Sequence, residues 1–132
     1  MKVLLDVNVI IDFYLNRDEA SKEIILKSVY GIYTAHISTN MLTDIYYILD
    51  KNGKEAGPIV EKLLQIFQVL DVTKDDCLRA LTLKMPDFED SVVAAVALSN
   101  NIDILVTRNE SDFKGSGLVV YSPDEFLERL RR

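Results

Sequence analysis

Residues 85–113 read MPDFEDSVVAAVALSNNIDILVTRNESDF, and this stretch places three acids at the start of a strongly apolar helix signal. Asp87, Glu89 and Asp90 stand directly before residues 91–98, which are apolar on nearly every side and therefore predict a buried helix. Asp87 and Asp90, three residues apart, suit the first turn of a helix, where backbone N–H groups lack partners. Capping explains these acids by themselves, but the rest of the chain adds a second explanation.

Short apolar runs alternate with longer helical patterns along the whole chain. The runs that predict strands are 2–5, 32–37, 67–72, 103–106 and 118–121. The patterns that predict helices are 8–15 and 19–29, as one broken hairpin, then 39–50, 57–66, 74–84, 89–99 and a last helix that starts at Ser122. Two starts carry capping boxes, at Thr73 and at Ser122. This alternation predicts an α/β fold with a five-stranded parallel sheet covered on both faces, in a single domain of residues 1–132.

Composition excludes several kinds of chemistry. The chain has 132 residues with a net charge of −6, which argues against broad cationic binding of nucleic acid. His36 is the only histidine and Cys77 the only cysteine, so catalytic triads, zinc sites of the usual ligands and internal disulfides are not expected. We expect His36 to be structural. No apolar run is long enough to span a membrane and an acid stands at position 6, so we expect a cytoplasmic protein.

The acids gather at one expected edge of the sheet. In a parallel sheet, ligands bind at the carboxyl ends of the strands, and the helices that pack on the sheet begin at the same edge. Seven polar side chains fall there by their place in the sequence, four of them acids: Asp6, Asp44, Asp90, Asp112, Asn8, Thr107 and Asn109. At about 5 Å and an effective dielectric near 20, each pair of like charges costs about 3 kcal/mol. Folding alone gives no reason to accept that cost.

A divalent cation supplies the reason. Oxygen ligands without histidine or cysteine suit Mg²⁺ or Mn²⁺, and we expect Asp6, Asp90 and Asp112 to be the metal ligands. Two such ions about 4 Å apart can activate water and stabilise the leaving oxygen of a phosphodiester. Asp87 is then expected to be a cap or an outer partner of the site.

The sequence resembles a known family at this point. Residues 4–17 (LLDVNVIIDFYLNR), 37–49 (ISTNMLTDIYYIL) and 87–113 together resemble PIN-domain proteins of the VapC toxin type, and the resemblance continues through 115–127. It implies a Rossmann-like α/β/α sandwich with strand order 3-2-1-4-5. It also implies RNA cleavage that depends on Mg²⁺ or Mn²⁺, a homodimer, and often a small antitoxin that plugs the acidic site with a basic side chain.

The resemblance also implies roles for single residues. Carried onto matching positions, the catalytic acids are Asp6, Asp44, Asp90 and Asp112, with Asn8 and Asn109 as supporting polar groups. The family usually has glutamate where this chain has Asp44. The second acid is therefore the position at which this chain departs from the pattern.

Each candidate has a structural alternative. Asp6 and Asp112 can each be explained as turn residues, and Asp12 as a solvated or capping residue. Arg108 and Lys114 flank the expected site as candidates for phosphate contact, although unpaired surface cations are the commoner case. We expect Tyr46 and Tyr47 to pack in the core, as aromatic residues of helices usually do.

Other functions stay open from the sequence. LLDVNVI also resembles the start of a haloacid-dehalogenase phosphatase, but that family has a second acid where Asn8 stands and a lysine that this chain lacks in place. A phospho-receiver domain fits less well, because no aspartate follows the third strand with a lysine after the fifth. A PIN-like module that binds RNA or a partner without cleaving is the third alternative, and the departure at Asp44 makes it plausible.

Overall fold

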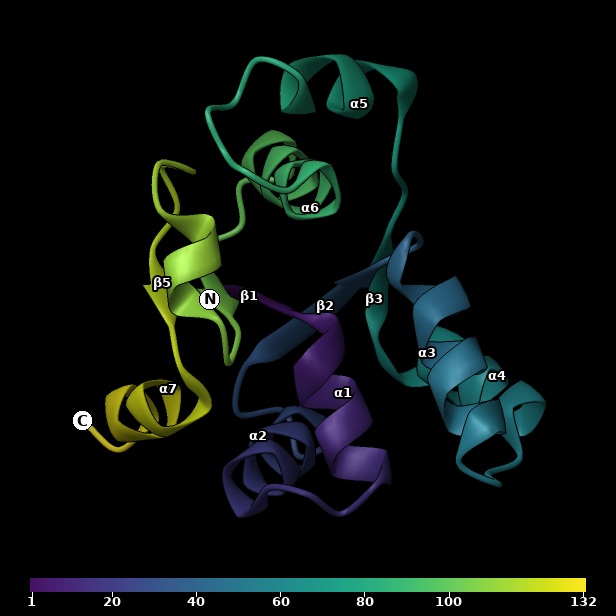
Figure 1. Ribbon diagram of the computed structural model, residues 1–132. Coiled ribbons are helices and arrows are strands. Elements are labelled where there is room, and N and C mark those ends of the chain that lie inside the picture. The colour runs from purple at the N-terminus through teal and green to yellow at the C-terminus, as the bar shows by residue number, and fades with distance from the viewer.

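The computed structural model describes residues 1–132 and contains one parallel sheet of five strands in the order β3-β2-β1-β4-β5 (Figure 1). The strands are β1 (Lys2–Leu5), β2 (Thr34–Ser38), β3 (Gln68–Leu70), β4 (Ile104–Val106) and β5 (Val120–Tyr121). All four neighbouring pairs are parallel, with Val3 opposite both Ala35 and Ile104 in the central register. The order expected from the family resemblance is therefore confirmed, although β2, β3, β4 and β5 are shorter than the apolar runs that predicted them.

Helices cover both faces of this sheet. They are α1 (Val7–Tyr14), α2 (Glu19–Val29), α3 (Met41–Lys51), α4 (Ala56–Ile66), α5 (Lys74–Ala80), α6 (Phe88–Ser99) and α7 (Pro123–Leu130), with a short 3₁₀ helix η1 (Glu110–Phe113). Figure 1 shows α5 and α6 above the sheet and α1, α2 and α7 below it, with α3 and α4 on the lower right. The packing of α5 on α6, and of α1 on both α2 and α3, agrees with that view. The molecule is the expected three-layer α/β/α sandwich.

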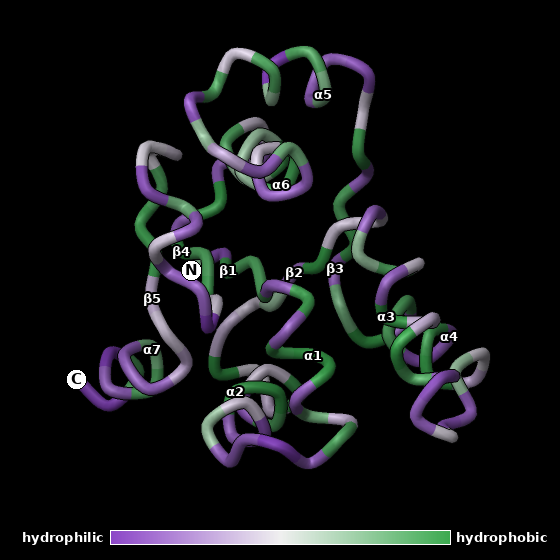
Figure 2. The backbone as a smooth tube through the Cα atoms, in the orientation of Figure 1, coloured by the Kyte–Doolittle hydropathy of each residue, from purple (hydrophilic) through white to green (hydrophobic).

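The central strands and the helix α6 form the core. Val3, Leu4 and Leu5 of β1 are fully buried, and Figure 2 shows hydrophobic residues concentrated along the strands and the helix sides that face them. Seven consecutive residues of α6, Ser91 to Ala97, are buried, because the helix lies between the sheet and α5. Its alanines and valines are small enough to allow close approach on both sides. The apolar run in the sequence thus reflects burial on two faces.

Capping fixes where several helices begin and end. The capping boxes expected at Thr73 and Ser122 are both present, with Asp76 and Glu125 completing them. The helix expected over 74–84, however, ends at Ala80. The following turn has i→i+3 backbone bonds, and the Thr82 hydroxyl donates to the Arg79 carbonyl, so the α-helical bonding pattern stops there.

Three further expectations have clear outcomes. His36 is buried with its Nδ1 atom 3.2 Å from the Val3 carbonyl, which confirms a structural place for it. The packing expected for Tyr46 and Tyr47 is wrong, since both are exposed, Tyr47 to 66%. On α3 the buried face is set by Met41, Ile45 and Leu49, and the two tyrosines fall outside that stripe. None of the helices has the length and apolar character needed to cross a membrane.

Candidate functional site at the carboxyl edge of the sheet

Asp6 connects the central strand to the first helix. It directly follows β1 and caps α1, with its Oδ1 accepting a hydrogen bond of 2.9 Å from the Val7 backbone N–H. Its Oδ2 accepts a 2.8 Å hydrogen bond from the Thr107 hydroxyl. Only 9% of Asp6 is exposed, and this burial raises the pKa of its carboxyl against the hydrogen bonds from Thr107 and Val7, which lower it. The structural alternative for Asp6, a hydrogen bond to the next turn, is thus present in the structure, together with a desolvated carboxylate.

Thr107 organises the polar groups beside Asp6. It is fully buried at the end of β4, and its hydroxyl oxygen accepts bonds from the Asn109 backbone N–H at 3.1 Å and the Asn8 side-chain amide at 3.3 Å. The Asn8 amide nitrogen also lies 3.5 Å from Oδ2 of Asp6. Asn8 and Thr107 therefore belong to one network with Asp6, while Asn109 joins it through its backbone.

Asp90 lies in the first turn of α6 and faces the same edge. Burial comes first among the causes that raise the pKa of its carboxyl to about 6, followed by the negative charges of Asp87, Asp6 and Asp112. Asp87 caps this helix, with its Oδ1 accepting a 3.0 Å bond from the Asp90 backbone N–H, so the expected capping role is confirmed. Asp90 itself makes no side-chain hydrogen bond that would account for its position.

Asp112 faces Asp90 from η1. The two residues line a hollow of about 150 Å³ with Asp87 and Pro86. Its charge contributes to the raised pKa values of both Asp6 and Asp90. The turn alternative would require the Asp112 side chain to accept a nearby backbone N–H, but it accepts no hydrogen bond within the chain. Asp6, Asp90 and Asp112, from three separate elements, therefore share one electrostatic environment, and we call them the aspartate trio.

Asp44 stands apart from the aspartate trio. It is half-buried in the first turn of α3, and it acts on the pKa of Glu89 in α6. A hydrogen bond with Asp44, burial, and the charges of Asp44, Asp87 and Asp90 raise the pKa of Glu89 to about 7. Glu89 thus joins the edge as a residue that sequence reasoning did not select as a candidate. Its place next to Asp90 in the sequence was the only available signal.

The two candidate cations differ in their surroundings. Lys114 is exposed and forms no ion pair. Arg108 forms an ion pair with Asp12 on α1, with its Nε 2.9 Å from Oδ2. The expectation that Asp12 is solvated or capping is wrong, since Asp12 is 0% exposed and lies inside α1. α1 packs against α2 and α3, and Arg108 lies against the Asp12 carboxylate, which is left with no exposed surface.

The donor set at this edge fits Mg²⁺ or Mn²⁺. The polar side chains that join the aspartate trio, those of Asn8 and Thr107, offer oxygen or amide groups. Burial raises the pKa of Asp90 most, and a bound cation would relieve the repulsion from Asp87, Asp6 and Asp112 that adds to it. In the present side-chain positions no three acidic groups are close enough to hold one ion. Rotation of these short side chains is the adjustment that binding would require.

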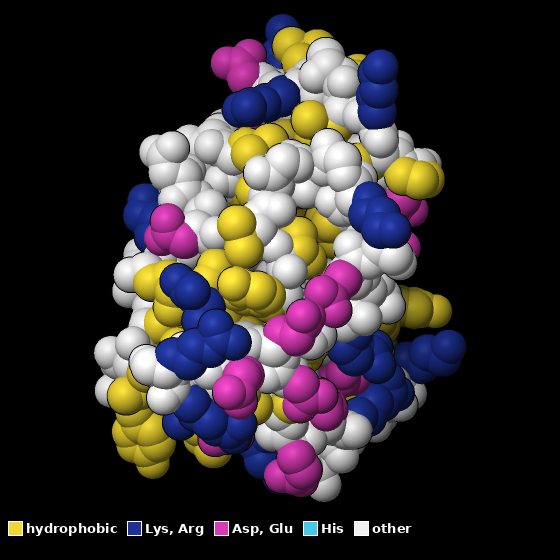
Figure 3. All heavy atoms as spheres, turned by 90° about the vertical axis from the view of Figure 1, so that its left-hand side faces the viewer, with side chains coloured by type: hydrophobic (Ala, Val, Ile, Leu, Met, Phe, Trp, Pro, Cys, Tyr) yellow, Lys and Arg dark blue, Asp and Glu magenta, His cyan; other side chains and the backbone are white.

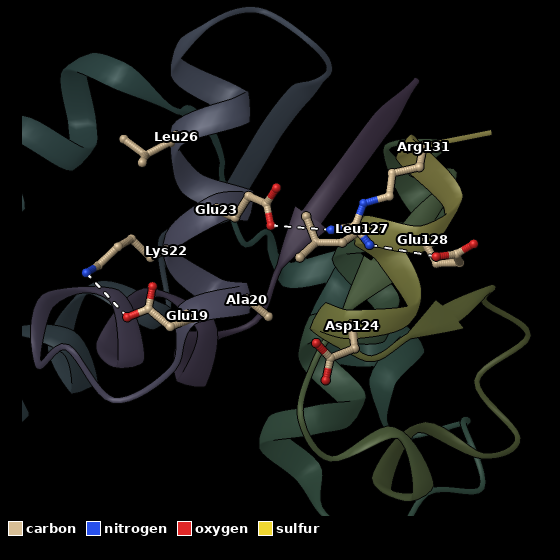
Figure 4. Close-up of a pocket in the computed structure, with 9 residues that line it drawn as sticks. All are labelled: Glu19, Ala20, Lys22, Glu23, Leu26, Asp124, Leu127, Glu128 and Arg131. Carbon is tan, nitrogen blue, oxygen red and sulfur yellow. Dashed lines mark ion pairs between the residues drawn. The ribbon is translucent and has the colours of Figure 1, made fainter.

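The largest hollow of the surface lies elsewhere. It has a volume of about 640 Å³ and runs between α2 and α7, with Arg131 reaching Glu23 across it at 3.8 Å (Figure 4). Ala20, Leu26 and Leu127 provide its apolar atoms. It contains none of the residues at the carboxyl edge, and size alone does not make it the site of chemistry.

Comparison with known proteins places this fold among solved structures. A toxin-antitoxin complex from Klebsiella pneumoniae matches 92% of this chain and 97% of its own, with a TM-score of 0.72 at 21% identity. VapBC2 from Rickettsia felis, bound to a DNA fragment from its promoter, matches 92% of this chain and 98% of its own, with a TM-score of 0.74 at 18% identity. VapC20 from Mycobacterium tuberculosis, a Sarcin-Ricin loop cleaving toxin, matches 89% of this chain and 96% of its own, with a TM-score of 0.67 at 16% identity.

Sequence comparison gives the family. No curated protein matches the chain. The PIN domain pattern matches residues 2–111, which include the central strand, both ends of α6 and the turn after β4. Since this match spans most of the chain and the strand order agrees with it, the protein is a member of the PIN domain family.

Proposed function

We propose that this protein is a ribonuclease that hydrolyses RNA phosphodiester bonds with the help of Mg²⁺ or Mn²⁺, and that it is the toxin of a toxin–antitoxin pair. The observation that carries the proposal is the electrostatic coupling of Asp90 with Asp6 and Asp112 at the carboxyl edge of a PIN domain. Carboxylates that raise one another's pKa values in a fold of this kind mark a site of function more often than a site of stability.

The aspartate trio would hold the metal. When bound, the ion supplies an activated water and a positive charge for the leaving oxygen. The Thr107 hydroxyl occupies one lone pair of Asp6 Oδ2 and keeps that carboxylate oriented toward the edge. The amide group of Asn8 holds the Thr107 hydroxyl in turn, so Asp6 is fixed before substrate arrives.

Asp44 and Glu89 would act from the opposite side of the edge. With a pKa of about 7, the Glu89 carboxyl is able to hold or release a proton near neutral pH. Asp44 of α3 is the first cause of this raised pKa of Glu89, which lies in α6. We infer that Asp44 is the fourth catalytic acid and that its shorter side chain is supplemented by Glu89.

RNA would be attracted by the metal more than by the surface. The chain carries a net charge of −6, and on the face shown in Figure 3 Lys and Arg side chains are interspersed with Asp and Glu side chains. No continuous basic surface extends over that face. Lys114, close to the acidic edge, and Arg108, from its position beside Asp12, are the cations we propose for contact with phosphate. Binding should therefore depend more steeply on divalent metal than on monovalent salt.

Partners are proposed from the kinds of structure that share this fold. The solved neighbours include toxin–antitoxin complexes from Klebsiella pneumoniae and Rickettsia felis. We infer a small antitoxin partner, a homodimer and a cytoplasmic location for this chain on that basis and on the family resemblance. A short gene beside its own that encodes a DNA-binding protein would support the antitoxin.

A module that binds RNA or a partner without cleaving is the second candidate. Two observations favour it. Asp44 stands where the family usually has glutamate, and no three acidic side chains are gathered closely enough for one ion in the present positions. This candidate predicts metal-independent RNA binding with no cleavage.

The deciding experiment is cleavage of a labelled RNA in Mn²⁺, with and without a chelator. The proposal expects cleavage that stops in EDTA, returns with added metal, and is lost in Asp90→Asn. Ser122→Ala is the control, because Ser122 caps α7 and does not line the hollow that Asp87, Asp90 and Asp112 share. Binding without cleavage would favour the second candidate, and turnover of a phosphomonoester without RNA cleavage would favour a phosphatase.

A further inference from the structure

Asp12 is a fully buried carboxylate with an incomplete set of partners. It is 0% exposed, and neither of its side-chain oxygens has a well-aligned hydrogen bond. Nε of Arg108 lies 2.9 Å from Oδ2, but the N–H direction is off the line to the oxygen, so the contact is an ion pair rather than a good hydrogen bond. Oδ1 has no partner. Burying a charge with so little compensation is costly for folding.

Stability does not explain why an acid is kept at this position. A buried ion pair can often be replaced by apolar side chains of similar volume with no loss of stability. Ile10 and Ile11, which precede Asp12 in α1, are buried. The Asp12 side chain itself lines a hollow with the charged residues Arg17, Asp18 and Arg108, and it pairs there with Arg108. We therefore consider what the ion pair between Asp12 and Arg108 does for Arg108.

Arg108 lies in the turn that supports the candidate metal site. Its backbone N–H donates to the Asn8 side-chain oxygen at 3.3 Å, and the residue before it, Thr107, donates to Asp6. The charge of Arg108 is close enough to lower the pKa of Asp6. Its side chain is 49% exposed and long, yet it crosses to α1 and pairs with Asp12. The backbone of Arg108 thus lies in the turn that holds Asp6, while its guanidinium group pairs with Asp12 on α1.

A free guanidinium beside the aspartate trio would compete with a metal ion. Arginine pairs strongly with carboxylates through charge-assisted hydrogen bonds. Because it is attached to the same chain, its effective concentration at the edge would reach the millimolar range, comparable to that of the metal. Arg17, Asp18 and Asp124 line a hollow of about 350 Å³ together with Asp12 and Arg108, and within this hollow Arg108 forms its ion pair with Asp12.

We propose that Asp12 is a positioning residue that holds the Arg108 guanidinium on α1 and so keeps it from occupying the aspartate trio in place of a divalent cation. The inference rests on the proposed function, because it takes the trio to be the metal site. It assigns a role to a residue that does not touch the metal. It also explains why an incompletely paired carboxylate is kept inside α1.

The test is a double-mutant cycle on Mn²⁺ binding, measured by calorimetry on the protein without RNA. Asp12→Asn should weaken the apparent affinity about tenfold, because about 1.4 kcal/mol of competing interaction corresponds to that factor. Arg108→Gln should not weaken it. The double variant Asp12→Asn/Arg108→Gln should bind Mn²⁺ as Arg108→Gln does, since the competitor is gone. Asp124→Asn, which removes a charge from the same hollow, is the matched control and should leave the affinity unchanged.

Three results would overturn the proposal. One is that Asp12→Asn weakens Mn²⁺ binding equally in the wild-type background and in the Arg108→Gln background. Another is that Asp12→Asn does not weaken Mn²⁺ binding at all. The third is failure of both Asp12→Asn and the apolar variant Asp12→Leu to fold, which would assign Asp12 to the structure of α1. Absence of Mn²⁺ binding by the wild-type protein is a different result, because it refutes the proposed function and the inference with it.

Discussion

Removal of the Asp90 charge should stabilise the metal-free protein. The Asp90 carboxyl has its pKa raised from the usual 3.8 to about 6 in the folded state, so its ionised form is disfavoured by folding. That difference corresponds to at most about 3 kcal/mol. Because Asp90 is only half-buried, solvent screening reduces the expected effect to about 1 to 2 kcal/mol. Asp90→Asn should therefore melt roughly 4 to 8 °C above the wild type in chelator at about pH 7.5.

The pH dependence of this effect follows from the direction of the shift. Below pH 3.8, the pKa of Asp90 in the unfolded state, the Asp90 carboxyl is protonated in both the folded and the unfolded state. It then does not lower the stability of the wild type. As the pH rises and Asp90 ionises in the unfolded state, the free energy of unfolding of the wild type falls relative to Asp90→Asn. This difference reaches its full size above about pH 6. The stability difference between Asp90→Asn and the wild type should thus be present near neutral pH and shrink toward pH 4. A melting scan in chelator at several pH values measures it.

Metal should reverse the order of the two proteins. A cation that binds only the folded wild type at a hundred times its Kd adds about 2.7 kcal/mol of stability, while Asp90→Asn binds it less well. In excess Mn²⁺ the wild type should then melt at the higher temperature. The reasoning is refuted if Asp90→Asn melts below the wild type in chelator, because the carboxylates would then not repel one another. Ser122→Ala again serves as the control, with a shift that does not depend on metal.

Three further outcomes are expected. Asp44→Asn should reduce RNA cleavage less than Asp6→Asn does, because Asp44 pairs with Glu89 rather than with the aspartate trio; equal loss in a rate comparison would show otherwise. Thr107→Val should lower the free energy of unfolding in urea by about 1 to 3 kcal/mol, since a buried hydroxyl with three hydrogen-bond partners is lost, and an unchanged midpoint would contradict this. Ser122→Ala should cost about 1 kcal/mol by loss of a helix cap while Mn²⁺ affinity stays the same, and a change in affinity would place Ser122 in the site.

The sheet could be predicted from the sequence because its signals are local. Each strand is a short apolar run, and the alternation with helices requires parallel pairing. The capping boxes at Thr73 and Ser122 are likewise decided within four residues. The order of the strands came from the family resemblance. The end of α5 at Ala80 was missed because the i→i+3 bonding around Thr82 has no signal in the apolar pattern.

The candidate site could be predicted in part. Position at a strand end or a helix start placed Asp6, Asp90 and Asp112 at one edge, and the structure has them in one electrostatic environment. Glu89 was not selected because its contact with Asp44 joins two helices that are far apart in the sequence. A pairing over such a distance leaves no pattern in a single sequence.

Asp12 and the two tyrosines of α3 show a different limit. The pattern of α1 suggested an exposed acid, but α1 is enclosed on several sides, and the partner of Asp12 lies 96 residues later at Arg108. Tyr46 and Tyr47 were assigned to the core by residue type, whereas their helical positions put them outside the buried stripe. Position on the helix was the better guide there, and residue type the weaker one.

Crystals of the protein soaked in Mn²⁺ and measured at an anomalous wavelength would show whether the aspartate trio binds the metal. We expect an anomalous peak between Asp6, Asp90 and Asp112, with oxygen ligands from at least two of these side chains, and no such peak in crystals of Asp90→Asn. A wild-type edge that stays free of Mn²⁺ at millimolar concentration, or a peak at a place that none of the three aspartates reaches, would contradict it.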